Sequence, residues 1–495
     1  MLANPARWVG LTLEELIKLH QAHPLSCSWQ CAKVFDWQRI HHFAHLDLDP
    51  QSRLTLYLGT RCKAKIPQEM PCLRHIECSL SKSKECTRWA DTVRDVDPVR
   101  NPYAPGAGQR PPELAGRDAE LAAFDVALER VERGRPERSL ILTGLRGVGK
   151  TVLLNALRSK ALDRGWGTGK VEARPDTSLR RPLTGALHAA VRELSVRHRA
   201  PDRVGEVLGT LKAFGLRSNP RGGKLIERWT PAIDGPTSSG RADSGDMEID
   251  LLELLTDVAS LASDVGVGVA VFLDEMQDLT PEDVSALCAS CHELSQTGAP
   301  LMIVGAGLPH LPSVLSASKS YSERLFRYVR IDRLDSAGVE RALLAPAQRE
   351  GATWSADALN AMGATSGGYP YFVQAYGKAA WDHAPDSPIT AADVAVAAPE
   401  AEAELAVGFF GSRYERATPA ERDYLRAMAG LTSDLAPDAP VSTTDVADLL
   451  GRKPSSLSPA RDALLKKGLV YSAERGSLAF TVPHFGRWLR THPPA

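Results

Sequence analysis

The sequence predicts an α/β fold, in which a parallel sheet carries helices on both faces, followed by a helical segment and a winged helix. Three observations support this prediction. Apolar runs of strand length alternate with helical periodicity between residues 114 and 334. A glycine-rich stretch joins one of these runs to a helix, and an acidic pair follows another. Near the end of the chain, three helical patterns precede two short strands.

The glycine-rich stretch reads SLILTGLRGVGKT over residues 139–151, and its second part matches G-x-x-x-x-G-K-[ST]. Glycines let backbone N–H groups turn inward around an anion, and the following helix adds the partial positive charge of its N-terminus. A glycine-rich turn that binds nothing is the alternative, which the flanking strand and helix disfavour. The stretch therefore predicts a P-loop NTPase core that binds ATP. Its predicted nucleotide-binding residues are Gly144, Arg146, Gly147, Val148, Gly149, Lys150, Thr151 and Val152.

An acidic pair follows the apolar run 267–273 and has the pattern of a Walker B motif. We expect Lys150 to reach the β- and γ-phosphates and the Thr151 hydroxyl to bind Mg²⁺. Asp274 would hold the same Mg²⁺, and Glu275 would polarise the attacking water. The motif is weak alone, but it becomes informative downstream of a P-loop.

Composition limits the function classes. With 495 residues the chain is too long for one core, and its net charge of -1 does not mark the whole chain as a nucleic-acid-binding protein. The longest apolar run is too short to span a bilayer, and no signal peptide is visible. Eight cysteines without a secretory signal lead us to expect reduced thiols and a cytoplasmic protein without a membrane partner.

We expect four regions, with bounds 1–98, 99–335, 336–405 and 406–495. Six cysteines and several histidines fall in the first region, where either a zinc site or a weakly folded extension explains them. The Pro/Gly-rich residues 101–112 predict a linker, and residues 217–245 predict a mobile loop. Cys288 and Cys291 lie on one predicted helix face and are expected to be buried thiols.

The C-terminal region predicts helices over 419–429, 443–450 and 456–467, then strands over 469–472 and 477–482. This order is typical of a winged helix. Residues 440–495 carry eight basic and four acidic side chains, which gives a local net charge of +4. Arg461 on the third helix and Arg475 in the turn are therefore candidate DNA contacts. Winged helices also bind proteins, so a protein partner stays open.

Several segments together resemble bacterial Orc-like AAA+ ATPases, which lie close to the STAND signalling ATPases. The segments are GLRGVGKT, VFLDEMQDL, VGAGLP, SYSERLF and GYPYFVQ, and the winged helix follows them. The resemblance covers about residues 99–490 and implies an ATPase core, a helical lid and a C-terminal winged helix. It also implies that Gly116 and Arg117 begin the adenine pocket and that Pro370 belongs to a lid turn that contacts adenine.

The chain departs from this family in two places that read the γ-phosphate. The fourth strand ends in Gly305-Ala306-Gly307, where a polar Asn, Ser or Thr is usual, and the lid helix begins with Tyr371-Phe372, where an Arg is common. ATP binding is therefore a safer expectation than fast hydrolysis. Arg324 is a candidate arginine finger, which would act across a subunit boundary in a homo-oligomer; the alternative is a surface arginine.

The sequence therefore predicts an ATP-dependent switch, in which ATP and Mg²⁺ control the position of the winged helix on DNA or a protein partner. Two alternatives remain open. One is a nucleotide-held binding module with negligible turnover, and the other is a DNA-binding regulator that does not need hydrolysis.

Overall fold

The computed structural model describes residues 44–48, 54–58, 96–106, 108–198, 201–216, 233, 237–432 and 439–492, the first two ranges by backbone alone. The chain forms two compact units, Met1–Ala90 and Asp91–Ala495. In the first unit, strands β1 (Ala44–Leu48) and β2 (Leu54–Leu58) pair antiparallel. The six cysteines of the predicted zinc site lie outside the described residues. The finer division into four regions stays a prediction.

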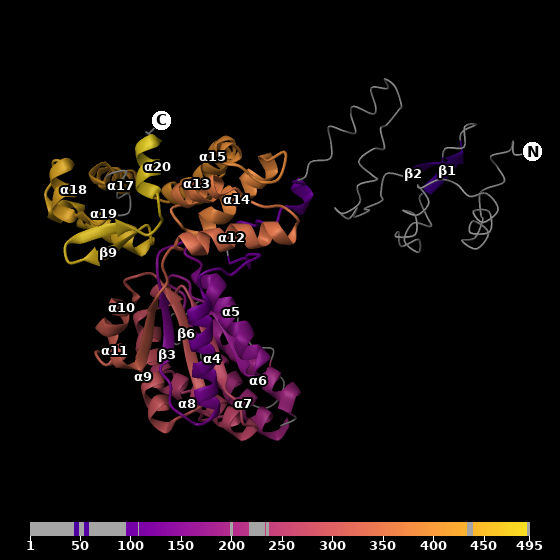
Figure 1. The fold of residues 1–495 in the computed structure, drawn as a ribbon. Helices are drawn as coiled ribbons and strands as arrows, with labels where there is room; N and C mark the ends of the chain where they lie inside the picture. Colours follow the sequence, from indigo (N-terminus) through magenta and orange to yellow (C-terminus); the bar gives the residue numbers. More distant parts are fainter. Residues whose placement is uncertain are drawn as a thin grey trace, which may run out of the picture. The chain divides into compact units, whose positions relative to one another are not determined.

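The second unit contains the predicted parallel sheet, with strand order β4-β5-β6-β3-β7 (Figure 1). Every neighbouring pair in it is parallel. Its strands are β3 (Ser139–Thr143), β4 (Gly167–Glu172), β5 (Val269–Asp274), β6 (Leu301–Gly307) and β7 (Phe326–Arg330). Strand β3 leads into the predicted glycine-rich stretch, and β5 lies on the predicted apolar run 267–273 and ends one residue after it, at Asp274.

Helices cover both faces of this sheet. Leu140 and Leu142 pack in one apolar cluster with α4 and α5, whereas Ile141 packs in the other with α6 to α9. This alternation follows the two-residue period of a strand that is buried on both faces. The helices are α4 (Asp118–Glu132), α5 (Lys150–Asp163), α6 (Arg180–His198), α7 (Pro201–Leu216), α8 (Met247–Val265), α9 (Pro281–Thr297), α10 (Leu311–Ser318) and α11 (Ser322–Leu325).

A strong local signal marks the start of α9, because Thr280 caps the helix and Pro281 opens it. Cys288 and Cys291 are buried free thiols, as expected. Helices α7 and α8 were not predicted. Most of the predicted loop 217–245 lies outside the described residues, and residues 237–245 run in turns to the Asp246 cap of α8.

Four helices follow the sheet: α12 (Ser336–Arg349), α13 (Ala356–Ser366), α14 (Pro370–His383) and α15 (Ala391–Leu405). The predicted linker, residues 101–112, is extended but packed against them rather than free. Tyr103 is buried, its hydroxyl donates to Leu343 O at 2.5 Å, and it accepts from Trp354 Nε1 at 2.8 Å. An aromatic side chain can anchor a Pro/Gly-rich run, and Tyr103 does so here within the extended segment.

The C-terminal region contains the predicted helices and hairpin, together with a short strand, β8, and a last helix, α20. Its strands form an antiparallel sheet of order β8-β10-β9. The elements are a π-helix, η6 (Ala406–Gly411), then α16 (Ser412–Tyr414), α17 (Pro419–Leu431), β8 (Val441–Ser442), α18 (Thr443–Leu449), α19 (Pro454–Lys466), β9 (Val470–Glu474), β10 (Ser477–Phe480) and α20 (Phe485–Thr491). Within the described part of the chain, no helix is long and apolar enough to cross a membrane.

The buried carboxylate of Glu421 ties α17 to the end of α19. Lys467 Nζ donates to it at 2.6 Å, and the Thr418 N–H donates at 3.0 Å. Burial alone would raise the pKa of this carboxyl, but these hydrogen bonds together lower it below its usual value. The ionised side chain therefore stabilises the fold.

We expect Glu421→Gln to destabilise the C-terminal region by about 1–3 kcal/mol at neutral pH. Because the folded pKa is lowered, the stabilisation is fully present above the unfolded pKa of about 4.3 and is lost as the pH falls through the folded value. Thermal unfolding of both chains between about pH 7 and pH 3 tests this. The two curves should converge at low pH, and a pH-independent difference would contradict the assignment. Glu474→Gln, at an exposed position, is the matched control.

Candidate functional site

The glycine-rich loop lies at the carboxyl end of β3 and leads directly into α5. Gly147 and Gly149 have φ angles of 82° and 88°, which L-amino acids with side chains rarely adopt. A Cβ on Gly144 would lie 2.2 Å from the carbonyl oxygen of Ile331. Gly149 is the N-cap of α5 and supplies no side-chain hydrogen bond to the first turn. The loop and the helix N-terminus therefore have the geometry of an anion cradle.

Lys150 is buried inside this loop. Its Nζ donates to the carbonyl oxygens of Gly144 at 2.9 Å and Leu145 at 2.8 Å. Burial lowers the pKa of the lysine to about 8, against the opposing effect of the Glu275 carboxylate. The ammonium group thus donates to carbonyl oxygens of the loop itself, and a bound phosphate could replace these carbonyls as its acceptor.

The acidic pair lies at the same end of the sheet. Asp274 ends β5 and is 4% exposed, and its Oδ1 accepts from the Glu275 N–H at 3.0 Å. Glu275 has a φ of 52°, an uncommon conformation for a residue with a side chain. Its Oε1 pairs with Arg146 of the glycine-rich loop at 3.2 Å, and its Oε2 accepts from Gln277 at 2.6 Å. The structure therefore brings the two predicted motifs into direct contact.

The other predicted residues of the loop and of α5 also lie here. Val148 is buried in the core, and Thr151 and Val152 are half-buried in the first turn of α5. A Cβ on Gly108 would lie 2.9 Å from the Thr151 methyl group, so the segment before α4 passes over the start of α5.

Arg117 is buried against the loop, but its guanidinium is occupied by backbone carbonyls. It donates to Asp332 O at 2.6 Å, Val148 O at 3.1 Å and Gly116 O at 3.2 Å. Burial lowers its pKa, against the opposing charges of Glu120 and Asp332. Arg117 therefore fixes the glycine-rich loop to the segment after β7, and contact with adenine stays a prediction for Gly116 and Arg117.

Pro370 is the first residue of α14, and the backbone beside it contacts the glycine-rich loop. The Tyr371 N–H donates to Gly147 O at 3.2 Å. The preceding Gly368 has a φ of 76°, and a Cβ there would lie 2.4 Å from Leu334 O. A glycine is thus required for the turn that places α14 on the loop.

Two residues near the site, Arg413 and Gln277, were not among the predicted site residues. Arg413 stacks on the Phe409 ring at 4.3 Å, and Phe409 stacks on Tyr371 at 4.8 Å. Burial, together with the nearby charge of Arg146, lowers the pKa of Arg413 to about 10. Gln277 bonds to Glu275 and lies within the predicted VFLDEMQDL motif, so its spacing from Glu275 could have identified it.

Arg324 lies at the opposite end of the sheet. It is exposed on α11, directly before β7, whose first residue pairs with Ser139 at the start of β3. Since the glycine-rich loop follows the end of β3, Arg324 is not part of the site of its own chain. It lines a shallow pocket together with Arg138 and Leu294.

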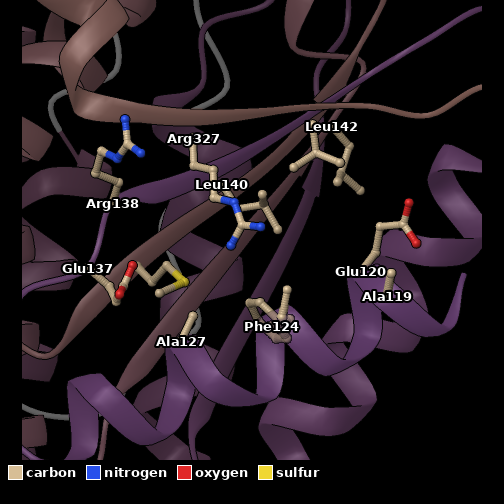
Figure 2. Close-up of a pocket in the computed structure, with 12 residues that line it drawn as sticks. Ala119, Glu120, Phe124, Ala127, Glu137, Arg138, Leu140, Leu142 and Arg327 are labelled. Atoms are coloured by element: carbon tan, nitrogen blue, oxygen red, sulfur yellow. The ribbon is translucent and has the colours of Figure 1, made fainter.

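A second pocket lies between α4 and the sheet and contains none of the predicted nucleotide-binding residues. Figure 2 shows Phe124 and Ala127 of α4 on one side and Leu140 and Leu142 of β3 on the other. Its apolar floor and its place on the sheet face distinguish it from the phosphate cradle.

Comparison with known proteins gives two family matches. Residues 113–304 match the model of the AAA ATPase domain, and residues 407–489 match a domain of unknown function (DUF8462). No curated protein matches the chain.

Solved structures are similar at low identity. A Walker-type ATPase of Pyrococcus abyssi is 16% identical, with a TM-score of 0.49, over 77% of this chain and 97% of that one. Cdc6p from Pyrobaculum aerophilum is 17% identical, with a TM-score of 0.37, over 80% and 98%. The RuvB Holliday junction branch migration motor of Thermotoga maritima is 16% identical, with a TM-score of 0.38, over 78% and 100%. The five-stranded parallel sheet and its glycine-rich loop give this part of the chain, with its AAA ATPase domain, the fold of a P-loop NTPase.

Proposed function

We propose that this chain is an ATP-dependent molecular switch that binds ATP with Mg²⁺ in the glycine-rich loop. The backbone N–H groups of residues 144–151 and the Lys150 ammonium would hold the phosphates. The Thr151 hydroxyl and the Asp274 carboxylate are hard oxygen ligands suited to Mg²⁺. Asp274 is the last residue of β5, and Thr151 lies in the first turn of α5, after the loop that follows β3. Glu275 would accept a proton from the attacking water.

The observation that carries the proposal is that this loop is hydrogen-bonded to both regions that follow the sheet. Gly147 O accepts from Tyr371 of α14, and the Arg146 N–H donates to Thr481 O, directly after β10, at 2.9 Å. A Cβ on Gly468 would lie 3.0 Å from Arg146 Nη2. A change in the loop backbone on phosphate binding would therefore act on both regions through short, direct contacts.

Arg146 would connect phosphate binding to both the Glu275 carboxylate and the C-terminal region. The same residue pairs with Glu275 through its side chain and holds the C-terminal region through its backbone. Phosphate oxygens would compete with Glu275 for the Arg146 guanidinium. Release of Glu275 Oε1 would then free this carboxylate to orient a water molecule.

A specific observation also favours the rival function, a nucleotide-held binding module with negligible turnover. Both oxygens of Glu275 are engaged by protein groups, and β6 ends in glycines rather than in a polar side chain. Steady phosphate release that disappears in Glu275→Gln, while nucleotide binding survives, would support hydrolysis. Absence of release from the wild-type chain would support the rival.

The C-terminal region is proposed to contact DNA. Arg475 is exposed in the turn between β9 and β10, and Arg461 lies on α19. Arg461 bonds to the neighbouring Asp462 at 2.9 Å, a surface pair that is weak enough to yield to a phosphate. A protein partner for the same surface is the alternative outcome.

Lys150→Ala should weaken ATP binding at least about tenfold, which is ~1.4 kcal/mol, because it removes the charge that faces the phosphates. Calorimetric titration with ATP and Mg²⁺ measures this. Lys160→Ala lies on the same helix but pairs with Asp125, and it should bind normally. Equal affinity of the wild-type chain and Lys150→Ala would remove the site.

Nucleotide should also loosen the contact between the loop and β10. We expect amide hydrogen exchange across residues 468–482 to accelerate when ATP binds, because this segment loses the hydrogen bond that Arg146 N–H donates to Thr481 O and then opens more readily. Lys150→Ala should show no acceleration at the same ATP concentration. Unchanged exchange in the wild-type chain at saturating ATP would contradict the switch.

Arg324 is proposed to act in the site of a neighbouring copy. Hydrolysis per chain should then rise with protein concentration, and Arg324→Ala should abolish the rise while ATP still binds. Arg327→Ala, an exposed arginine three residues further on, is the control. A rate per chain that is independent of concentration and survives Arg324→Ala would exclude the finger.

Replacing Arg461 and Arg475 together by Ala should flatten the slope of log K against log salt for duplex DNA by about two, since each phosphate contact contributes about 0.9. The full chain and the double variant are titrated at several salt concentrations. Arg133→Ala with Arg138→Ala, in the ATPase domain, is the matched control. Identical slopes would mean that Arg461 and Arg475 do not meet phosphates, and a chain that binds no duplex at low salt would favour a protein partner.

A further inference from the structure

We propose that Gln277 is a positioning residue for Glu275 and supplies the polar group that is missing from the end of β6. The inference rests on the proposed hydrolysis at Glu275. Gln277 lies in a short 3-10 helix, η5 (Met276–Asp278), directly after the acidic pair. Its Nε2 donates to Glu275 Oε2 at 2.6 Å, and its Oε1 accepts from the Leu308 N–H at 3.0 Å.

These two hydrogen bonds fix the orientation of the Gln277 amide. A backbone N–H can only donate, so the atom facing Leu308 is the amide oxygen, and the NH₂ group faces the carboxylate. A donor to an ionised carboxylate makes a short, charge-assisted hydrogen bond. Gln277 therefore links the Glu275 side chain to the backbone directly after β6. Met276 lies between Glu275 and Gln277 in the sequence, and Glu275 itself has a left-handed backbone conformation.

The glycines of β6 make room for this arrangement. A Cβ on Gly305 would lie 2.0 Å from Met276 Sδ, and one on Gly307 would lie 3.0 Å from Gln277 Oε1. Real Cβ atoms are not found at the first distance and are crowded at the second. Glycines at these two positions of β6 thus leave space for the side chains of Met276 and Gln277. The polar group at the end of β6 is therefore the Gln277 amide, which comes from the neighbouring turn.

The two partners of Glu275 would have different roles. Arg146 holds Oε1 and belongs to the loop that would change on phosphate binding. Gln277 holds Oε2 from a turn that follows the rigid strand β5. When Arg146 leaves, Gln277 would keep the carboxylate from rotating and present Oε1 to a water molecule. Gln277 therefore acts through Glu275 and does not itself touch the phosphate.

The test compares Gln277→Ala with the wild-type chain in three measurements: kcat for ATP hydrolysis, affinity for a slowly hydrolysed fluorescent ATP analogue, and melting temperature without nucleotide. We expect kcat to fall at least about tenfold, since a well-placed general base contributes 10²–10⁴. Analogue affinity should stay within about twofold, and the melting temperature within about 2 °C. Gln296→Ala, an exposed glutamine on α9, should match the wild-type chain throughout.

Gln277→Glu gives a second, volume-conserving test if the alanine variant unfolds early. It replaces the amide donor with a carboxylate beside Glu275, so kcat should fall similarly while analogue binding survives. A wild-type kcat in either variant overturns the inference. So does a loss of analogue affinity that equals the loss of kcat, because it indicates a general structural role. Absence of turnover in the wild-type chain overturns the inference and the proposed hydrolysis together, whereas normal turnover in the Gln277 variants leaves the proposed function standing.

Discussion

The pair formed by Arg146 and Glu275 is the interaction on which the rest of the site depends. It joins the loop after β3 to the acidic pair after β5, although β6 separates these strands in the sheet. The Arg146 backbone also holds the segment after β10. One residue of the glycine-rich loop therefore contacts both the Glu275 carboxylate and the C-terminal region. When an anion binds at or leaves the glycine-rich loop, such a residue can change the contact between the loop and the C-terminal region.

Much of the fold could be predicted because its signals are local. The P-loop spacing, the acidic pair after an apolar run, and Thr280 before Pro281 each lie within a few residues, and the structure contains the corresponding elements. Helix α8 was missed although Asp246 and Gly266 cap it. Its charged Asp250 is fully buried and pairs with Arg180 of α6 at 2.9 Å, a partner far away in the sequence. Pattern reasoning treats such a residue as exposed, because buried charges are rare without a partner.

In the candidate site, too, the residues with a local sequence signal were predicted, and those that depend on contacts distant in the sequence were not. Residues 144–152, Asp274 and Glu275 were predicted from motif spacing, and the structure brings the two motifs together through the pair of Arg146 with Glu275. Arg413 was missed because only the folded chain brings it close to Arg146. The sequence predicted that Arg117 lies near the nucleotide site. It could not reveal that the Arg117 guanidinium donates hydrogen bonds to three backbone carbonyls. Side-chain orientation depends on contacts that are distant in the sequence, so motifs identify positions better than they identify roles.

The charges around the glycine-rich loop favour a polyanionic ligand. The positive charge of Arg146 lowers the pKa of both Lys150 and Arg413, whereas the carboxylates of Glu275 and Asp274 act in the opposite direction on Lys150. Burial lowers the pKa of Lys150 to about 8 and that of Arg413 to about 10, so both cations are held in an environment that penalises their charge. A triphosphate would relieve this penalty at both residues, whereas Mg²⁺ would offset the two carboxylates. ATP with Mg²⁺ would therefore lower the electrostatic cost of holding these charges together, and the contacts of the loop with α14 and with the segment after β10 lie directly beside them.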